Sequence, residues 1–323
     1  MTRPARRAVV TGGAGFLGSH MCERLLALGY SVVCIDNLST GALDNIRALS
    51  QDPNFAFREA DLSAGLDVTG PVTDVLHMAC PASPRDYLRL PLETLRVGSA
   101  GTQHALDLAA RHGARFLLTS TSEVYGDPLV HPQPESYWGN VNPVGPRAVY
   151  DEAKRFSETL TITYRERQGL DARIARIFNT FGPRMRGDDG RMIPTFITQA
   201  LAGDPLTVAG NGEQTRSLCY VDDTVDGLLA LLTSPDVRGP VNIGGSGELS
   251  VLQTARAVIA AAGSSSDVVF VPRPEDDPSL RCPDTSLAAE RLGWRPRIDL
   301  EEGLRRTIRW FAESRVASPG LVR

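Results

Sequence analysis

The chain has 323 residues, of which 42% are hydrophobic and 22% charged, and its formal net charge at pH 7 is -4. This balance is ordinary for a soluble globular protein, and it gives no reason to expect nucleic acid or a membrane surface as a partner. No run approaches the roughly 20 apolar residues of a membrane-spanning helix. The basic start at residues 1–7 lacks the apolar segment of a secretory leader, so none is expected.

The five cysteines are dispersed and form no CxxC or CxxH spacing. An odd, scattered set in a chain of this size indicates reduced thiols rather than a disulfide framework or a metal site. We therefore expect a cytoplasmic protein without a bound metal.

Short apolar runs alternate with longer amphipathic segments over the first half of the chain. Strands are predicted at residues 8–11, 31–35, 55–57, 74–78, 115–119 and 172–177. Helices are predicted at residues 15–28, 91–112 and 150–168. This alternation predicts an α/β fold, a doubly wound parallel sheet of the Rossmann type with helices on both faces.

Beyond residue 178 the alternation loosens, and turns rich in proline and glycine become frequent. We predict a nucleotide-binding domain at residues 1–178, to which residues 215–244 return. Residues 179–214 and 245–323 would form a smaller, interleaved C-terminal lobe for the substrate.

A glycine-rich turn joins the first predicted strand to the first predicted helix. Gly12, Gly15 and Gly18 permit a tight turn, a close backbone approach to pyrophosphate and close packing of helix on strand, and the helix start supplies amide donors. Asp36 ends the second strand about 20 residues further on, where a carboxylate accepts hydrogen bonds from ribose hydroxyls and repels a 2′-phosphate. The pattern predicts NAD rather than NADP. Predicted contacts beside the glycines and Asp36 are Phe16, Leu17 and Asn37.

The GxxGxxG spacing, with Asp61 and Leu62 after the third strand, resembles the extended short-chain dehydrogenases. In that family the aspartate matching Asp61 binds adenine. The resemblance covers nearly the whole chain and adds Asp61 and Leu62 to the expected cofactor contacts.

Tyr150 and Lys154 lie four residues apart on a predicted helix and so share one face. An unperturbed tyrosine has a pKa near 10, and a neighbouring ammonium group and a positive nicotinamide ring both favour the phenolate. A YxxxK pair alone is weak, because helix surfaces produce many. Together with the glycine turn it indicates that Tyr150 is the base for a sugar hydroxyl, and in short-chain dehydrogenases the lysine also holds the nicotinamide ribose.

Ser122 and Glu123 follow the fifth predicted strand, and ligands bind at the carboxyl ends of strands in open α/β sheets. A hydroxyl there can bond the reacting sugar oxygen, and a carboxylate can act on the far side of the substrate. By spacing alone, a polar loop or a helix cap is an equal alternative.

Several long motifs resemble the UDP-glucuronic acid decarboxylase (UDP-xylose synthase) family. They lie at residues 77–84, 119–154, 176–185, 188–191 and 214–223. In such enzymes the positions matching Ser122, Glu123, Tyr150, Lys154 and Arg281 carry the chemistry.

The resemblance implies that NAD takes a hydride from C4 of UDP-glucuronic acid while Tyr150 removes the hydroxyl proton. The resulting β-keto acid loses carbon dioxide, and return of the hydride gives UDP-xylose with the cofactor recycled. Arg281 would orient the substrate carboxylate, and Ser122 and Glu123 would assist decarboxylation and reprotonation at C5. Predicted helices at residues 92–112 and 150–168 match the pair that commonly forms a dimer interface in these relatives, so a homodimer is expected.

Two arginines are candidates for the UDP diphosphate. Arg191 and Arg216 carry planar guanidinium groups that fit phosphate bidentately, although a surface ion pair is the alternative for each. Asn179 and Arg85 are weaker substrate candidates.

Two positions depart from the family pattern. Relatives commonly have asparagine where this chain has Gly98, and an aromatic residue where it has Ala209. The alternatives are a nucleotide-sugar 4-epimerase, which would lack the glutamate, a 4,6-dehydratase, which usually has Asp-Glu where this chain has Ser122 and Glu123, and a non-catalytic NAD(H)-responsive binding protein.

Overall fold

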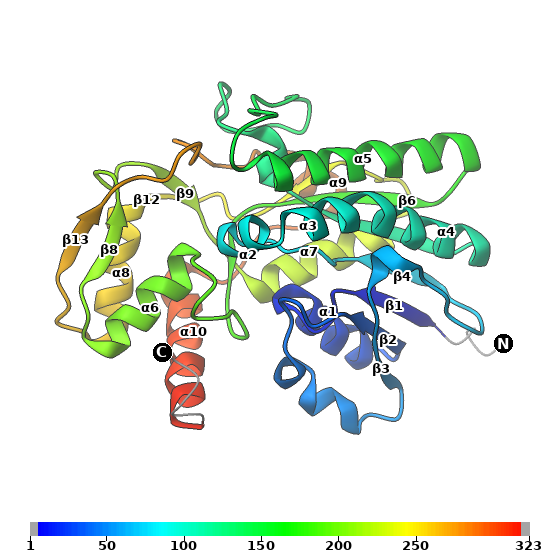
Figure 1. Ribbon diagram of the computed structural model, residues 1–323, viewed down its shortest axis with the longest axis horizontal. Coiled ribbons are helices and arrows are strands. Elements are labelled where there is room, and N and C mark those ends of the chain that lie inside the picture. The colour runs from blue at the N-terminus through cyan, green and yellow to red at the C-terminus, as the bar shows by residue number, and fades with distance from the viewer. Residues whose placement is uncertain (1–5, 318–323) are drawn as a thin grey trace.

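A computed structural model describes residues 6–317 of the chain (Figure 1). Residues 1–5 of the basic segment and residues 318–323 of the predicted C-terminal lobe lie outside the described residues. The centre of the fold is a seven-stranded sheet in the order β11-β6-β5-β4-β1-β2-β3, and every pair of neighbours is parallel. The strands are β1 Arg7–Thr11, β2 Ser31–Asp36, β3 Phe55–Glu59, β4 Asp74–His77, β5 Arg115–Thr121, β6 Ala172–Ile177 and β11 Val241–Ile243. The predicted α/β fold class is confirmed.

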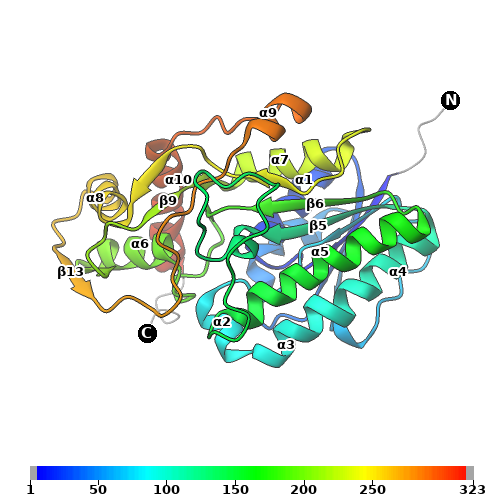
Figure 2. The ribbon, with the colours of Figure 1, turned by 90° about the horizontal axis from the view of Figure 1, so that it is seen from above.

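Helices cover both faces of this sheet. On one face lie α1 Phe16–Ala27 and α7 Val221–Thr233, and on the other α3 Pro91–Arg96, α4 Thr102–His112 and α5 Ala148–Gln168, which run side by side (Figures 1 and 2). Alternate residues of β1 therefore enter two different cores: Ala8 and Val10 pack toward α1, and Val9 packs toward α4. Burial on both faces is why this strand is a continuous apolar run.

The helix predicted at residues 91–112 is interrupted. Between α3 and α4 the chain makes a π-helical turn at Val97–Gly101. A Cβ atom at Gly98 would lie 2.7 Å from the Cβ of Ala153 on α5, so glycine lets the two helices approach closely. The Gly98 carbonyl accepts hydrogen bonds from Ser157 Oγ at 2.7 Å and Thr102 Oγ1 at 2.9 Å, which satisfy the oxygen in the widened turn.

A short helix before this point was not predicted. Residues Pro84–Arg89 form α2, with Ser83 as the N-cap whose hydroxyl accepts from the Asp86 amide. Proline at the first helical position suits a helix start, because its missing N–H would have no partner there.

Most of the remaining elements form a smaller lobe beside the sheet, drawn at the left of Figure 1. Its helices are α6 Met192–Ala202, α8 Val251–Ala262 and α10 Leu300–Ala317, whereas α9 Ser286–Leu292 packs against α7 and β11 beside the sheet. Its strand pairs are β7 Thr180–Phe181 with β10 Cys219–Tyr220, β9 Thr215–Ser217 with β12 Glu248–Ser250, and β8 Leu206–Ala209 with β13 Val268–Val271. Strand β11 pairs with β6 after the chain has passed through this lobe. The exact domain boundaries stay a prediction.

No helix among residues 6–317 is both long enough and apolar enough to cross a membrane.

Candidate active site

The glycine turn after β1 leaves a space that side chains at the glycine positions would fill. Gly12 has a φ of 70°, in the left-handed region, and a Cβ there would lie 2.7 Å from the backbone of Ala79. A Cβ at Gly18 would collide with the Gly12 carbonyl oxygen. The free space and the start of α1 therefore suit a pyrophosphate group, which needs a close backbone approach.

Asp36 is fixed at the end of β2 by backbone donors. Its Oδ2 accepts from the Ala14 amide at 3.0 Å and its Oδ1 from the Leu38 amide at 2.8 Å. Burial raises the pKa of Asp36, and these backbone hydrogen bonds oppose the rise. The carboxylate thus has a set orientation toward the pocket, as ribose recognition requires.

All of the predicted cofactor contacts in the glycine turn and after β2 and β3 lie around one pocket. These are Gly12, Gly15, Phe16, Leu17, Gly18, Asp36, Asn37, Asp61 and Leu62. The shape of the cradle and the placed carboxylate fit a dinucleotide without a 2′-phosphate.

Tyr150 and Lys154 lie in the first two turns of α5, and both are buried. The Lys154 Nζ donates to the Thr119 carbonyl at 2.8 Å and lies 6.0 Å from the centre of the Tyr150 ring. Burial raises the pKa of Tyr150 well above its ordinary value, Cys80 adds to the rise, and a hydrogen bond with Thr121 opposes it. Burial therefore outweighs the lowering that was predicted from the ammonium group of Lys154. The protein's own groups hold Tyr150 as a phenol.

Glu123, just after β5, lies between two arginines. Its Oε2 pairs with Arg147 Nη2 at 2.8 Å, and its Oε1 pairs with Arg281 Nη1. Burial pushes the pKa of Glu123 up, but Arg281 and Arg147 outweigh it and lower the pKa to about 2. Glu123 is therefore ionised at neutral pH. Arg281 also donates to the Gly126 carbonyl at 3.0 Å, so its guanidinium group is already engaged by this chain, and its predicted contact with a substrate carboxylate stays a prediction.

A second cavity adjoins the cofactor pocket, and Phe16, Leu17 and Arg191 line both. Most of the predicted catalytic and substrate-binding residues surround it: Ser122, Glu123, Tyr150, Asn179, Arg191, Arg216 and Arg281. Ala209, at the end of β8, lines it as well, so the missing aromatic ring leaves space in the wall.

The two diphosphate candidates already have carboxylate partners. Arg216 Nη2 lies 3.0 Å from each carboxylate oxygen of Asp277, and Arg191 Nε donates to Asp189 at 2.7 Å. Both guanidinium groups are thereby oriented at the cavity wall. Arg85 is placed differently: its side chain is 61% exposed, it pairs with Asp188, and it does not line the cavity.

Sequence reasoning missed several groups that the fold brings to this cavity. Tyr87 of α2 stacks on Tyr150 with ring centres 5.1 Å apart, and its buried hydroxyl has no partner among residues 6–317. Arg147 precedes Tyr150 by three residues, and Thr121 ends β5 next to Ser122. Arg147 could have been predicted, because a residue three positions before Tyr150 lies on the same side of a helix. Nothing local in the sequence marks Tyr87.

Within residues 6–317, no group of three or more His, Cys, Asp or Glu side chains is placed to hold a metal ion.

Comparison with known proteins defines the class. The model of the NAD dependent epimerase/dehydratase family matches residues 8–244, which contain the sheet, the glycine turn and the Tyr150–Lys154 pair. UDP-glucuronic acid decarboxylase 1 of Xenopus tropicalis is 48% identical over 306 residues, covering 95% of this chain and 72% of that protein. UDP-glucuronic acid decarboxylase 6 of Arabidopsis thaliana is 50% identical over 299 residues, covering 92% and 86%. The chain belongs to the NAD dependent epimerase/dehydratase family and, within it, to the UDP-glucuronic acid decarboxylases.

Solved structures of the wider family share the fold. UDP-glucuronic acid 4-epimerase of Bacillus cereus, in complex with UDP-glucuronic acid and NAD, aligns with a TM-score of 0.84 at 29% identity, over 95% of this chain and 99% of that one. The dTDP-glucose 4,6-dehydratase of Streptomyces venezuelae with NAD bound aligns with a TM-score of 0.87 at 29% identity, over 97% and 99%. The predicted cofactor, NAD, is confirmed.

Proposed function

We propose that the protein is a carboxy-lyase that converts UDP-glucuronic acid to UDP-xylose and carbon dioxide, using NAD that is reduced and reoxidised within one turnover. The observation that carries the proposal is the ionised Glu123 held between Arg147 and Arg281 in the cavity next to Tyr150. The names of the relatives, UDP-glucuronic acid decarboxylases at 48–50% identity, support it.

The residues divide the work as follows. NAD held by the residues around Gly12 and Asp36 would supply a reversible hydride acceptor for C4 and a positive charge that favours the phenolate of Tyr150. Tyr150 takes the proton of the 4-hydroxyl group, and Lys154, fixed on the Thr119 carbonyl, places its ammonium charge beneath the phenolate that the reaction needs. Thr121 donates toward the phenol oxygen and favours the same form.

Decarboxylation then requires little acid–base help. In the 4-keto sugar the C5–C6 bond breaks and carbon dioxide leaves. The electron pair of that bond passes into an enolate formed by C5, C4 and the C4 oxygen. Because Glu123 has a pKa of about 2, it orients hydroxyl groups or water instead of donating its own proton. The proton for C5 is therefore assigned to the Ser122 hydroxyl or to a water molecule that Glu123 holds.

The proposal is tested with purified protein and UDP-glucuronic acid, with and without added NAD, followed by mass spectrometry and proton NMR. Loss of one carbon dioxide to give UDP-xylose, slowed strongly by Tyr150→Phe and by Arg281→Ala, is the expected result. A product of unchanged mass would instead establish a 4-epimerase, an alternative that the likeness to the Bacillus cereus enzyme keeps in view. No turnover of any nucleotide sugar by NAD-loaded protein would indicate a non-catalytic binding protein and overturn the proposal.

We also propose a homodimer formed through the face that carries α3, α4 and α5 (Figure 2). Three large apolar side chains are exposed there: Leu92 at 59%, Leu95 at 42% and Phe156 at 51%. Exposed apolar groups gathered on one helical face are typical of an association surface. Sedimentation at micromolar concentration should show a dimer that Phe156→Glu converts to monomer, and monomer in the unmodified protein would remove the idea.

For the compartment we propose the cytoplasm. All five cysteines are unpaired, and four of them are buried, as expected for thiols in a reducing environment. Fractionation of the native host with an antibody to the protein tests this, and recovery in an extracytoplasmic fraction would contradict it.

A further inference from the structure

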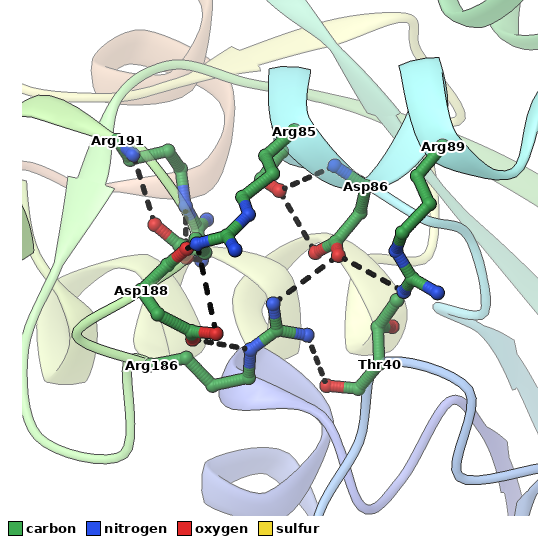
Figure 3. Close-up of polar contacts among 9 residues, drawn as sticks. Thr40, Arg85, Asp86, Arg89, Arg186, Asp188 and Arg191 are labelled. Carbon is green, nitrogen blue, oxygen red and sulfur yellow. Dashed lines mark hydrogen bonds and ion pairs between the residues drawn. The ribbon is translucent and has the colours of Figure 1, made fainter. Parts of the chain in front are cut away.

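The segment at residues 184–191, which we call the strap, connects β7 to α6 and carries a dense set of charges (Figure 3). Arg186 is at the centre of the contacts. Its guanidinium group donates to Asp86 Oδ1 at 3.2 Å, to Asp188 Oδ1 at 3.1 Å and to the Thr40 carbonyl at 3.4 Å. One side chain therefore joins the strap to α2 and to the loop after β2.

These contacts lie along the wall of the cofactor pocket. Thr40 and Asp86 line that pocket together with four residues of the strap, Arg184, Arg186, Asp189 and Arg191. Thr40 follows Asp36, the ribose-binding carboxylate, by four residues, and Asp86 lies in the helix that carries Tyr87. The strap thus bridges the ribose side of the pocket and the side that faces the sugar cavity.

Asp86 is a firm anchor for the strap. Its side chain is only 5% exposed, and it also accepts from the Ser83 hydroxyl at 2.8 Å and from Arg89 at 3.4 Å. Removing Arg186 would leave this buried carboxylate with a partner that is itself 56% exposed, a situation that is costly for a buried charge. The pairing at Arg186 therefore holds the strap more strongly than an ordinary surface ion pair would.

The strap also carries a group suited to the cofactor. Arg184 lines the pocket and pairs with Glu23 of α1 at 2.5 Å, while its Nη1 is buried without a hydrogen-bond partner among residues 6–317. A buried guanidinium nitrogen in that state is satisfied by an anionic oxygen, and a pyrophosphate supplies one.

We propose that Arg186 is the latch of this strap and slows the release of NAD. By pinning residues 184–191 to Asp86 and Thr40, it keeps the strap across the pocket mouth, and the cofactor leaves only after the latch has opened. The role is one of retention, since Arg186 does not line the sugar cavity. It suits a reaction in which the same cofactor molecule is reduced and reoxidised, but it rests on NAD binding and not on the identity of the sugar.

The test measures NADH dissociation by stopped-flow fluorescence, with excess NAD as the displacing ligand and no sugar nucleotide present. Arg186→Met, which removes the charge and keeps most of the length, should raise the dissociation rate about tenfold. Asp86→Asn should act in the same direction, and Arg186→Lys should lie between Met and the unmodified protein. The fraction of purified protein that carries NAD should fall in the same order.

Two controls make the outcome specific. Arg305→Met removes an arginine that pairs with Glu302 on α10, outside both pockets, and should leave the rate unchanged. Raising the salt concentration from 50 to 500 mM, chosen to screen ion pairs, should speed release from the unmodified protein much more than from Arg186→Met. A dissociation rate for Arg186→Met within about twofold of the unmodified protein, at an unchanged melting temperature, would overturn the proposal. If Asp86→Asn does not fold, the comparison of Arg186→Met with Arg186→Lys still decides.

Discussion

The cofactor pocket and the sugar cavity share a wall, but they are built in different ways. On the side of the glycine turn, the pocket takes its shape from backbone geometry, where Gly12 and Gly18 leave room and Asp36 is held by two amides. The cavity takes its character from charged side chains that only the fold brings together, such as Glu123 and Arg281, 158 residues apart. The glycine turn and Asp36 are local features, so they should act independently of the cavity, whereas the charges of the cavity act together.

The largest effect is expected at the single residue on which the cavity's chemistry depends. Tyr150→Phe removes the hydroxyl that takes the substrate proton and should lower kcat about 10³-fold. Tyr164→Phe is the matched control, because that tyrosine lies on the same helix and bonds Asp107 at 2.6 Å, away from both sites. Its kcat should stay within about twofold of the unmodified value. Turnover by Tyr150→Phe above one tenth of the unmodified rate would contradict its assignment as the base.

The next prediction sharpens the contrast between collective and independent action. Glu123→Gln and Arg281→Met should each lower kcat/KM about 100-fold, because both remove the Glu123–Arg281 ion pair. The first change leaves the buried Arg281 without its carboxylate, and the second leaves Glu123 with Arg147 alone. The double variant should be little worse than either single one, since the two changes remove the same interaction.

Asp36→Ala supplies the comparison from the cofactor pocket. The double variant Asp36→Ala/Arg281→Met is measured at a fixed, subsaturating NAD concentration. Its loss of kcat/KM should equal the product of the two single losses, because the two residues share no contact. Multiplicative losses for Glu123 and Arg281, or a strong coupling between Asp36 and Arg281, would break the distinction between the two sites.

The same distinction explains what the sequence could predict. The sheet, its helices and the glycine turn follow from local periodicity and from the conformations that glycine permits, so residues such as Gly12 and Asp36 could be assigned a role. Resemblance to a known family supplied Arg281, which no local pattern indicates. Arg147 and Tyr87 were missed, because their importance comes from which side chains they meet across the cavity.

Packing between helices was equally hidden. The apolar pattern of residues 91–112 is continuous, and it does not show that a π-helical turn at Val97–Gly101 separates α3 from α4. The turn depends on contact with Ala153 and Ser157 on α5, 55 residues or more away in sequence. Nor could the pKa of Tyr150 be predicted, since desolvation by the surrounding fold dominates it.

This contact makes a departure from the family pattern testable. Gly98→Asn restores the residue common in relatives, but its side chain would meet the Cβ of Ala153, which a Cβ at position 98 approaches to 2.7 Å. The substitution should lower the free energy of unfolding by about 2 kcal/mol, as overpacking of a close helix contact does. The double variant with Ala153→Gly should recover part of that loss in urea unfolding, because it removes the Cβ contact and leaves the backbone of residue 153 in place. A Gly98→Asn protein as stable as the unmodified one would show that the helices can separate freely at this point.

The smallest effect concerns a buried carboxyl group on α5, next to Tyr150. Desolvation and the nearby charge of Glu123 raise the pKa of Asp151 to about 7, and its Oδ1 is buried without a partner among residues 6–317. The unfolded chain ionises this group near its ordinary value of 3.8, while the folded protein keeps it protonated up to about 7. Its contribution to the unfolding free energy therefore falls as pH rises from about 3.8 to 7, and the cost is complete above pH 7.

Asp151→Asn removes that cost without changing the shape of the side chain. The variant should gain stability relative to the unmodified protein by an amount on the order of 1 kcal/mol larger at pH 8 than at pH 5, measured by urea unfolding at both values. Glu166→Gln, which changes an exposed carboxylate further along α5, should show no such difference between the two pH values. In a Glu123→Gln background the gain at pH 8 should shrink, because one of the charges that raises the Asp151 pKa is gone. An equal effect of Asp151→Asn at both pH values would mean that Asp151 does not belong to the coupled set of charges around Glu123.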